Sequence, residues 1–388
     1  MHHFDQLAPE VRARLFLTPP ANFTVASAAP ILAQCLGATL YVPGTRPELV
    51  ATIRKRIGEG SRSIVIDLED AVEGARVSEA FDKTVAALAD LSATPAGALV
   101  FVRVRSSEQV SALAGELGSD RSDALAGFVL PKFTSHDGGE SLDRVGDAAT
   151  TVGHRLWVMP VLETPEVLYR ESRSAELTAI GGLLAGFRDS VLAVRFGATD
   201  LCGLYGIRRD RDLVIYDVHL VASLIADTVN HLGRLDGTGF AISGPVWEHF
   251  PAHERIFRPL LRETPFVEGD LGSVRSRLVA RNLDGLIREV VLDRANGLVG
   301  KTVIHPVHVA AVHALSIVAH EEFADATDIL GGDGSADGGA MSSGYRNKMN
   351  EKGPHRRWAQ QVLHRAHAFG VARPEVSFAE VLAALLPG

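Results

Sequence analysis

The chain has 388 residues, of which 46% are hydrophobic and 22% charged, with a formal net charge of −8 at pH 7. This mild acidity argues against nucleic acid as a partner, because phosphate binding needs a clustered excess of Lys and Arg. Since no apolar run approaches the roughly 18 residues that span a bilayer, no membrane partner is expected. Only Cys35 and Cys202 are present, and residues 1–20 lack an apolar signal core, so a cytoplasmic protein without disulfides is expected.

Short runs rich in Val, Ile, Leu and Phe alternate with longer amphipathic stretches along most of the chain. The short runs have the length and composition of fully buried parallel strands. Strands are predicted at residues 39–42, 63–68, 99–104, 127–130, 156–161, 191–197, 239–243 and 301–304. The clearest helical patterns cover residues 47–57, 78–91, 165–185, 213–232, 270–295, 307–323, 359–369 and 377–386.

This alternation predicts an α/β fold, specifically a (β/α)8 TIM-type barrel. The alternative is an open doubly wound sheet, whose usual glycine-rich turn after the first strand is absent. The barrel domain is predicted to span residues 39–325. An N-terminal extension, residues 1–38, precedes it, and residues 326–388 form a C-terminal extension of a glycine-rich loop and helices.

Charged side chains follow nearly every predicted strand, at the end of a barrel where active sites lie. Glu163 and Asp200 follow neighbouring strands, which lie about 4.8 Å apart, so both carboxylates can reach one ion. A site with few protein ligands, all of them oxygen, and with room for water and substrate suits Mg²⁺ or Mn²⁺. The alternative is that both acids cap the helices that follow, as Thr164-Pro165 favours for the first.

Three acids, Asp67, Glu69 and Asp70, are crowded at the end of the second predicted strand. Crowded carboxylates repel one another, which raises the pKa of one of them. Such a carboxyl group can act as a general acid or base or hold a metal-bound water. The alternative is a capping box at the start of the next helix.

Basic side chains at the same end of the barrel balance these acids. Arg46, Arg103 and Arg105 suit bidentate clamps on a substrate carboxylate, and Arg103 and Arg105 share one face of a regular strand. Lys132 could form a Schiff base, or it could be part of an ion pair at the barrel rim.

The C-terminal extension opens with a glycine-rich stretch, residues 331–339, which predicts a mobile loop. A calcium-binding turn there is disfavoured because Ala336 replaces a ligand Asp. Residues 345–358 then concentrate basic side chains beside Tyr345 and Trp358. They predict either a solvated start to a helix or a lid over the barrel mouth of this subunit or a neighbour.

Taken together, the strand ends resemble the HpcH/HpaI aldolase and citrate lyase beta-subunit family. The matching stretches, in the family's order, are residues 40–47, 66–72, 102–104, 129–132, 162–164, 196–201 and 300–306. The resemblance implies a TIM-type barrel that binds Mg²⁺ through Glu163 and Asp200 and cleaves or forms carbon–carbon bonds beside a carbonyl. It also implies that Arg103 and the segment at Thr199 contact the substrate. Arg105 stands where citrate-lyase-like members usually have Asn.

Residues 3–5, 345–350 and 354–356 are similar to a divergent bacterial branch of TIM-barrel C–C bond lyases associated with tellurium-resistance-type stress operons. The C-terminal region used by the acyl-coenzyme A members has no match here, so dependence on coenzyme A is left open. Family barrels commonly associate, so a homo-oligomer, a trimer or hexamer, is expected.

The expected function is a Mg²⁺-dependent carbon–carbon lyase or aldolase that acts on a 2-oxo acid or related carboxylate through a metal-stabilised enolate. The expected catalytic residues are Arg103, Glu69 and Asp70. The alternatives are an acyl-CoA lyase, synthase or thioesterase at the same metal site, or a non-catalytic barrel in a stress complex. The expected substrate-binding residues are Arg46, Arg103, Arg105, Lys132 and Thr199.

Overall fold

The computed structural model describes residues 1–95, 97–250, 283–331 and 339–386. Eight parallel strands form one sheet in the order β7-β6-β5-β4-β3-β2-β9-β8. These strands are β2 (Ala38–Pro43), β3 (Ser63–Asp67), β4 (Leu99–Arg103), β5 (Leu125–Leu130), β6 (Trp157–Leu162), β7 (Arg195–Phe196), β8 (Ser243–Trp247) and β9 (Val299–Val303).

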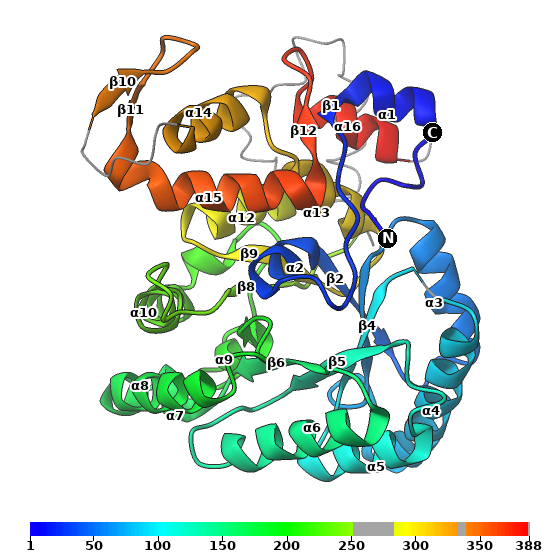
Figure 1. Ribbon diagram of the computed structural model, residues 1–388. Coiled ribbons are helices and arrows are strands. Elements are labelled where there is room, and N and C mark those ends of the chain that lie inside the picture. Colours follow the sequence, from blue (N-terminus) through cyan, green and yellow to red (C-terminus); the bar gives the residue numbers. More distant parts are fainter. Residues whose placement is uncertain (96, 251–282, 332–338, 387–388) are drawn as a thin grey trace.

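The two edges of this sheet meet beside β7. Val194 donates its backbone N–H to Ala241 and accepts one from Ser243, each over 2.8 Å. The sheet therefore closes on itself, and helices surround it (Figure 1). The predicted (β/α)8 barrel is confirmed, and the open doubly wound alternative is wrong.

The strand register brings Arg103 level with Asp67, the end of the strand that leads into Glu69 and Asp70. Every side chain of β3 is buried, as expected of a strand enclosed on both faces. Asp67 pairs with Pro43 on one side and with Arg103 on the other, so the last residues of β2, β3 and β4 lie side by side. These carboxyl ends form the mouth of the barrel.

Strand β8 begins where the predicted strand at residues 239–243 ends. Its pairing with β9 shifts register at Gly244 and again before Val246. Pro and Gly are disfavoured in regular strands, but bulges accommodate them. The strand therefore continues beyond Ser243, the predicted end, through Gly244 and Pro245 to Trp247.

The helices of the described chain pack around the barrel and over one of its ends (Figure 1). Their bounds are α1 (Pro9–Leu15), α2 (Ala29–Cys35), α3 (Leu49–Gly58), α4 (Val77–Ala93), α5 (Ser107–Leu117), α6 (Gly138–Val152), α7 (Pro165–Leu168), α8 (Arg170–Gly186), α9 (Ala198–Gly203), α10 (His219–Leu232), α12 (Asp284–Ala295), α13 (Val307–Ser316), α14 (His320–Leu330), α15 (Lys352–Phe369) and α16 (Phe378–Leu385). No described helix has the length and apolar character of a membrane span.

Several predicted helices differ from the structure. The predicted helix over residues 165–185 is broken into α7 and α8 at Tyr169, whose ψ of 134° is extended. The predicted helix over residues 307–323 is likewise two helices, because Val318 leaves the helical path to bridge Val371. The helix predicted to start at residue 213 begins at His219. Residues 270–282 of another predicted helix lie outside the described residues.

The N-terminal and C-terminal extensions pack together. Strand β1 (Phe16–Thr18) pairs antiparallel with β12 (Val371–Ala372), and the blue and red elements lie side by side at the top of Figure 1. His3 stacks on Phe369 with ring centroids 4.2 Å apart. Helix α15 packs on α2, which leads into the start of β2. This layer therefore lies at the amino-terminal end of the barrel, opposite the mouth.

The basic segment of the C-terminal extension belongs to the same layer. Strands β10 (Ala340–Ser342) and β11 (Met349–Glu351) form a hairpin, and Lys348 lies 2.6 Å from Glu321 and 2.8 Å from Asp325 on α14. The predicted lid over the mouth of its own barrel is therefore wrong, and contact with a neighbour's mouth stays a prediction. Residues 332–338, most of the predicted mobile loop in which a calcium-binding turn was disfavoured, lie outside the described residues.

Candidate active site

Arg103 is surrounded by carboxylates at the barrel mouth. Its Nε and Nη2 donate to the two oxygens of Asp67 over 2.7 and 2.6 Å, and its Nη1 donates to Asp70 over 2.9 Å. Nη1 also lies 3.0 Å from Glu69. Burial lowers the pKa of Arg103, but the hydrogen bonds and charge of Asp67 outweigh it and raise that pKa. The guanidinium is thus a permanent positive charge held by a bidentate contact.

Glu69 and Asp70 are carboxyl groups with different protonation behaviour. Burial, followed by the hydrogen bond with Asp70, raises the pKa of Glu69, although Lys132 donates to its Oε1. Burial also acts on Asp70, but its hydrogen bond with Glu69 and the charge of Arg103 lower its pKa overall. Glu69 therefore keeps a proton more readily than Asp70. Two carboxyl groups whose pKa values are pushed apart can serve as acid and base.

Glu163 and Asp200 form a second carboxylate pair. Glu163 follows β6, is only 4% exposed, and accepts a 2.7 Å hydrogen bond from the Lys132 backbone N–H. Burial, and then the charge of Asp200, raises the pKa of Glu163 to about 7. Asp200 lies in the first turn of α9, and burial, and then the charge of Asp70, raises its pKa. Each carboxylate therefore carries its negative charge at a cost.

The surroundings of this pair fit a divalent cation. Arg103 and Lys132 are engaged by Asp67, Glu69 and Asp70, and no ion pair within the described ranges reaches Glu163 or Asp200. In the same part of the chain, no group of three or more His, Cys, Asp and Glu side chains converges as a ligand set. A two-carboxylate site completed by water and substrate is how Mg²⁺ is commonly held.

Gly197 lies directly against Glu163. A Cβ added to Gly197 would collide with Oε2 of the Glu163 carboxylate. We predict that Gly197→Ala displaces this carboxylate and weakens Mg²⁺ binding at least about tenfold, a loss of roughly 1.4 kcal/mol. Calorimetric titration measures the change. Gly203→Ala in α9 is the matched control, because its Cβ would meet no atom within 4 Å. Equal affinity in both variants would contradict the placement of Glu163.

Arg105 is engaged by backbone groups rather than pointing at the centre of the mouth. Its Nη2 donates to the carbonyl oxygens of Glu69 and Val72, over 2.9 and 2.6 Å, and its Nε reaches that of Leu68 at 3.4 Å. It therefore holds the loop that carries the acidic residues. This geometry supports a positioning role for Arg105, and its predicted contact with the substrate stays a prediction.

Two other predicted substrate contacts lie at the rim. Thr199 is exposed beside Asp200 and donates its hydroxyl to Glu248, which follows β8. Arg46 is exposed after β2 and makes no side-chain hydrogen bond or ion pair with the described residues. Arg46 is therefore available to a ligand, and its substrate role stays a prediction.

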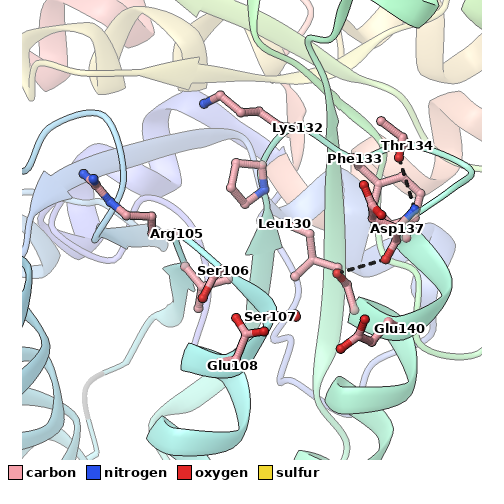
Figure 2. A pocket seen from close by; sticks show the side chains of 14 residues that line it. Arg105, Ser106, Ser107, Glu108, Leu130, Lys132, Phe133, Thr134, Asp137 and Glu140 are labelled. Carbon is pink, nitrogen blue, oxygen red and sulfur yellow. Dashed lines mark hydrogen bonds between the residues drawn. The ribbon is translucent and has the colours of Figure 1, made fainter. Parts of the chain in front are cut away.

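A cavity of about 270 Å³ adjoins the site between the loops that follow β4 and β5. Figure 2 shows Arg105 and Lys132 at its upper end, with Ser106, Ser107 and Glu108 on the α5 side. The cavity is close to, but below, the size of pockets that hold drug-sized ligands, so it suits part of a small molecule.

The sequence reasoning missed two residues beneath the mouth, Tyr41 and Arg195. Arg195 is 1% exposed, and its guanidinium and that of Arg103 both lie near the Tyr41 ring. The available signal was a charged residue inside an otherwise apolar strand at residues 191–197. Because Lys, Arg, Asp and Glu are almost never fully buried without a partner, such a position indicates a special environment.

Comparison with known proteins agrees with this arrangement. The family model described as C–C bond lyase of the TIM-barrel fold matches residues 30–371. The chain belongs to this family. It is thus a carbon–carbon lyase, and the predicted resemblance to the citrate lyase beta-subunit group is confirmed at the level of family and fold. The association of this chain with the branch found in tellurium-resistance-type stress operons stays a prediction.

Solved structures share the fold at low identity. A citrate lyase from Burkholderia xenovorans LB400 is 19% identical, with 91% of this chain and 96% of that one covered and a TM-score of 0.60. CitE from Mycobacterium tuberculosis is 21% identical, with 86% and 99% covered and a TM-score of 0.50. A Haloferax volcanii malate synthase is 13% identical, with 71% and 73% covered and a TM-score of 0.50. No curated protein matches the sequence.

Proposed function

We propose that this C–C bond lyase is Mg²⁺-dependent, with Mn²⁺ as a substitute, and acts on a 2-oxo acid or related small carboxylate through an enolate. The observation that carries the proposal is the carboxylate pair of buried Glu163 and half-buried Asp200, with which no basic side chain of the described chain forms an ion pair. The CitE structure contains magnesium, acetoacetate and coenzyme A, and the malate synthase structure contains magnesium and glyoxylate. These ligands belong to those proteins, and they support the choice of metal and substrate class here.

Glu163 and Asp200 would hold the ion, which supplies positive charge beside the substrate carbonyl. Arg103 adds a fixed positive charge on the same side, in a partly water-excluded site where it stabilises developing negative charge. Glu69, with its raised pKa, gives a proton to the carbon released by bond cleavage, and Lys132 orients its carboxyl group. Asp70, whose pKa is lowered, is ionised before the reaction and then accepts the proton from the substrate hydroxyl.

The adjoining cavity, at about 270 Å³, can take the distal part of a small carboxylate. Arg46 at the rim would bind a distal carboxylate. We place the enzyme in the cytoplasm, because its two cysteines, Cys35 and Cys202, are free and free thiols are typical of a reducing compartment.

Exchange of methyl protons tests the proposed enolate chemistry without knowledge of the full substrate. Pyruvate is incubated with the protein in D₂O, and loss of its methyl signal is followed by ¹H NMR. Exchange should run at least about tenfold faster with Mg²⁺ than with EDTA, since a tenfold gain needs only about 1.4 kcal/mol of enolate stabilisation. Equal rates in both conditions would contradict the proposal.

We predict that Lys132 forms no Schiff base. Although burial lowers the pKa of Lys132, the hydrogen bond and charge of Glu69 raise it overall, so the amine stays protonated and is a poor nucleophile. Borohydride is added to the protein with pyruvate or oxaloacetate, and mass spectrometry searches for a reduced adduct. An adduct on Lys132 would replace the metal-dependent mechanism with an imine mechanism.

A further inference from the structure

Arg195 carries a charge inside the barrel lumen. Its Nη2 donates to Thr302 on β9, its Nη1 lies 3.4 Å from the sulfur of Met159 on β6, and its Cζ is 5.8 Å from the centroid of the Tyr41 ring on β2. Because these strands are on different sides of the barrel, the guanidinium lies across the lumen. No carboxylate in the described ranges forms an ion pair with it.

Tyr41 lies between this buried charge and the mouth. Arg103, at the mouth, has its Cζ 5.3 Å from the ring centroid, so cationic groups approach the ring from both β4 and β7. Leu40 and Val42 are buried, whereas Tyr41 is only half-buried. Part of the Tyr41 side chain is therefore open to the space enclosed by the strand ends.

The hydroxyl of Tyr41 has a proton to donate. Arg195 and Arg103 both lie beside the Tyr41 ring, and a guanidinium has only donors, so neither can accept the phenol proton. Within the described part of the chain the Tyr41 hydroxyl donates no hydrogen bond, so its proton is free for a ligand. Burial raises the pKa of Tyr41, although both arginines oppose this, so the hydroxyl is protonated at neutral pH.

We propose that the Tyr41 hydroxyl, polarised by the neighbouring charge of Arg195, donates a hydrogen bond to the oxygen of the substrate on which negative charge develops. This inference rests on the proposed function and adds a catalytic residue to it. The phenol proton stays on Tyr41 throughout, so no extra acid or base is required. Arg195 does not touch the substrate and is a positioning residue. A site of this kind prefers ligands with a charged, planar oxygen group.

Oxalate tests this role, because it is a planar dianion that resembles the enolate of a 2-oxo acid. Its binding in the presence of Mg²⁺ is measured by calorimetry for the wild type, Tyr41→Phe and Tyr345→Phe. Hydrogen bonds to charged groups contribute about 1.5–3 kcal/mol, so Tyr41→Phe should weaken oxalate binding at least about tenfold. Mg²⁺ affinity should not change. Tyr345→Phe, in the C-terminal hairpin region, should match the wild type in both measurements.

Arg195→Lys is the second variant, for the case in which Tyr41→Phe does not fold. It keeps a positive charge but loses the guanidinium fork, so oxalate binding should fall about threefold to tenfold with Mg²⁺ affinity unchanged. Wild-type oxalate affinity in Tyr41→Phe, or in Arg195→Lys if only that variant folds, would overturn the inference and leave the proposed function intact. Failure of the wild type to bind oxalate with Mg²⁺ would overturn both.

Discussion

Glu163→Gln will abolish Mg²⁺ binding and reduce Mg²⁺-dependent proton exchange by about a thousandfold or more. A metal ion contributes several kcal/mol to charge stabilisation, and about 4 kcal/mol corresponds to that factor. Asp200→Asn should have a similar effect, because either change leaves one carboxylate ligand. Calorimetric titration and NMR exchange rates measure the two losses. Asp90→Asn is the control, since Asp90 forms only an exposed pair with Arg54.

The same variant should change the pH dependence of stability. Since burial raises the pKa of Glu163 to about 7, the folded protein binds its proton more tightly than the unfolded chain. Without metal, its contribution to stability is therefore present at acidic pH and is lost as the pH rises towards 7, by about 3 kcal/mol at most. Glu163→Gln should melt above the metal-free wild type at pH 8 and gain nothing from added Mg²⁺. Mg²⁺-dependent stabilisation of Glu163→Gln would contradict the assignment of Glu163 as a ligand.

Arg103→Lys will lower turnover by about a hundredfold or more while Mg²⁺ affinity stays close to wild type. Lysine keeps the positive charge but cannot make the bidentate contact with Asp67 while also contacting Asp70. The charge should move away from the developing oxyanion, and a hundredfold loss corresponds to about 2.7 kcal/mol. Steady-state kinetics with the substrate, or pyruvate exchange, measures the effect.

Stability must be followed in the same variant, because Arg103 and Asp67 are 12% and 2% exposed. Breaking a buried pair outright costs about 3–5 kcal/mol, so the melting curve shows whether lysine keeps the pair. Arg54→Lys is the control, since Arg54 and Asp90 are paired at the surface. Wild-type turnover in a stable Arg103→Lys variant would make Arg103 a structural residue of the barrel wall.

The barrel and the residues at its mouth could be predicted because both follow from local pattern. Buried parallel strands are read from short apolar runs, and each strand of a barrel ends at the same face. Asp67, Arg103 and Glu163 directly end or follow their strands, so their convergence needed only strand order and register. Asp200 follows β7 after a short connection and was found in the same way.

Features that depend on distant contacts could not be predicted from such patterns. Arg105 is aimed at the carbonyls of Glu69 and Val72 by the path of a loop, which strand alternation does not describe. The helix break at Val318 exists because Val371, far along the chain, bridges to it. The same long-range packing places the basic segment opposite the mouth, although its charge suggested a lid.

Crystals grown with MnCl₂ would test the metal assignment most directly. Anomalous scattering locates Mn²⁺ independently of any assumption about the ligands. We predict one strong peak at the barrel mouth within coordination distance, about 2.0–2.3 Å, of a carboxylate oxygen of Glu163 and one of Asp200. A peak bound instead by Asp67, Glu69 or Asp70, or no peak at the mouth, would contradict the two-carboxylate metal site.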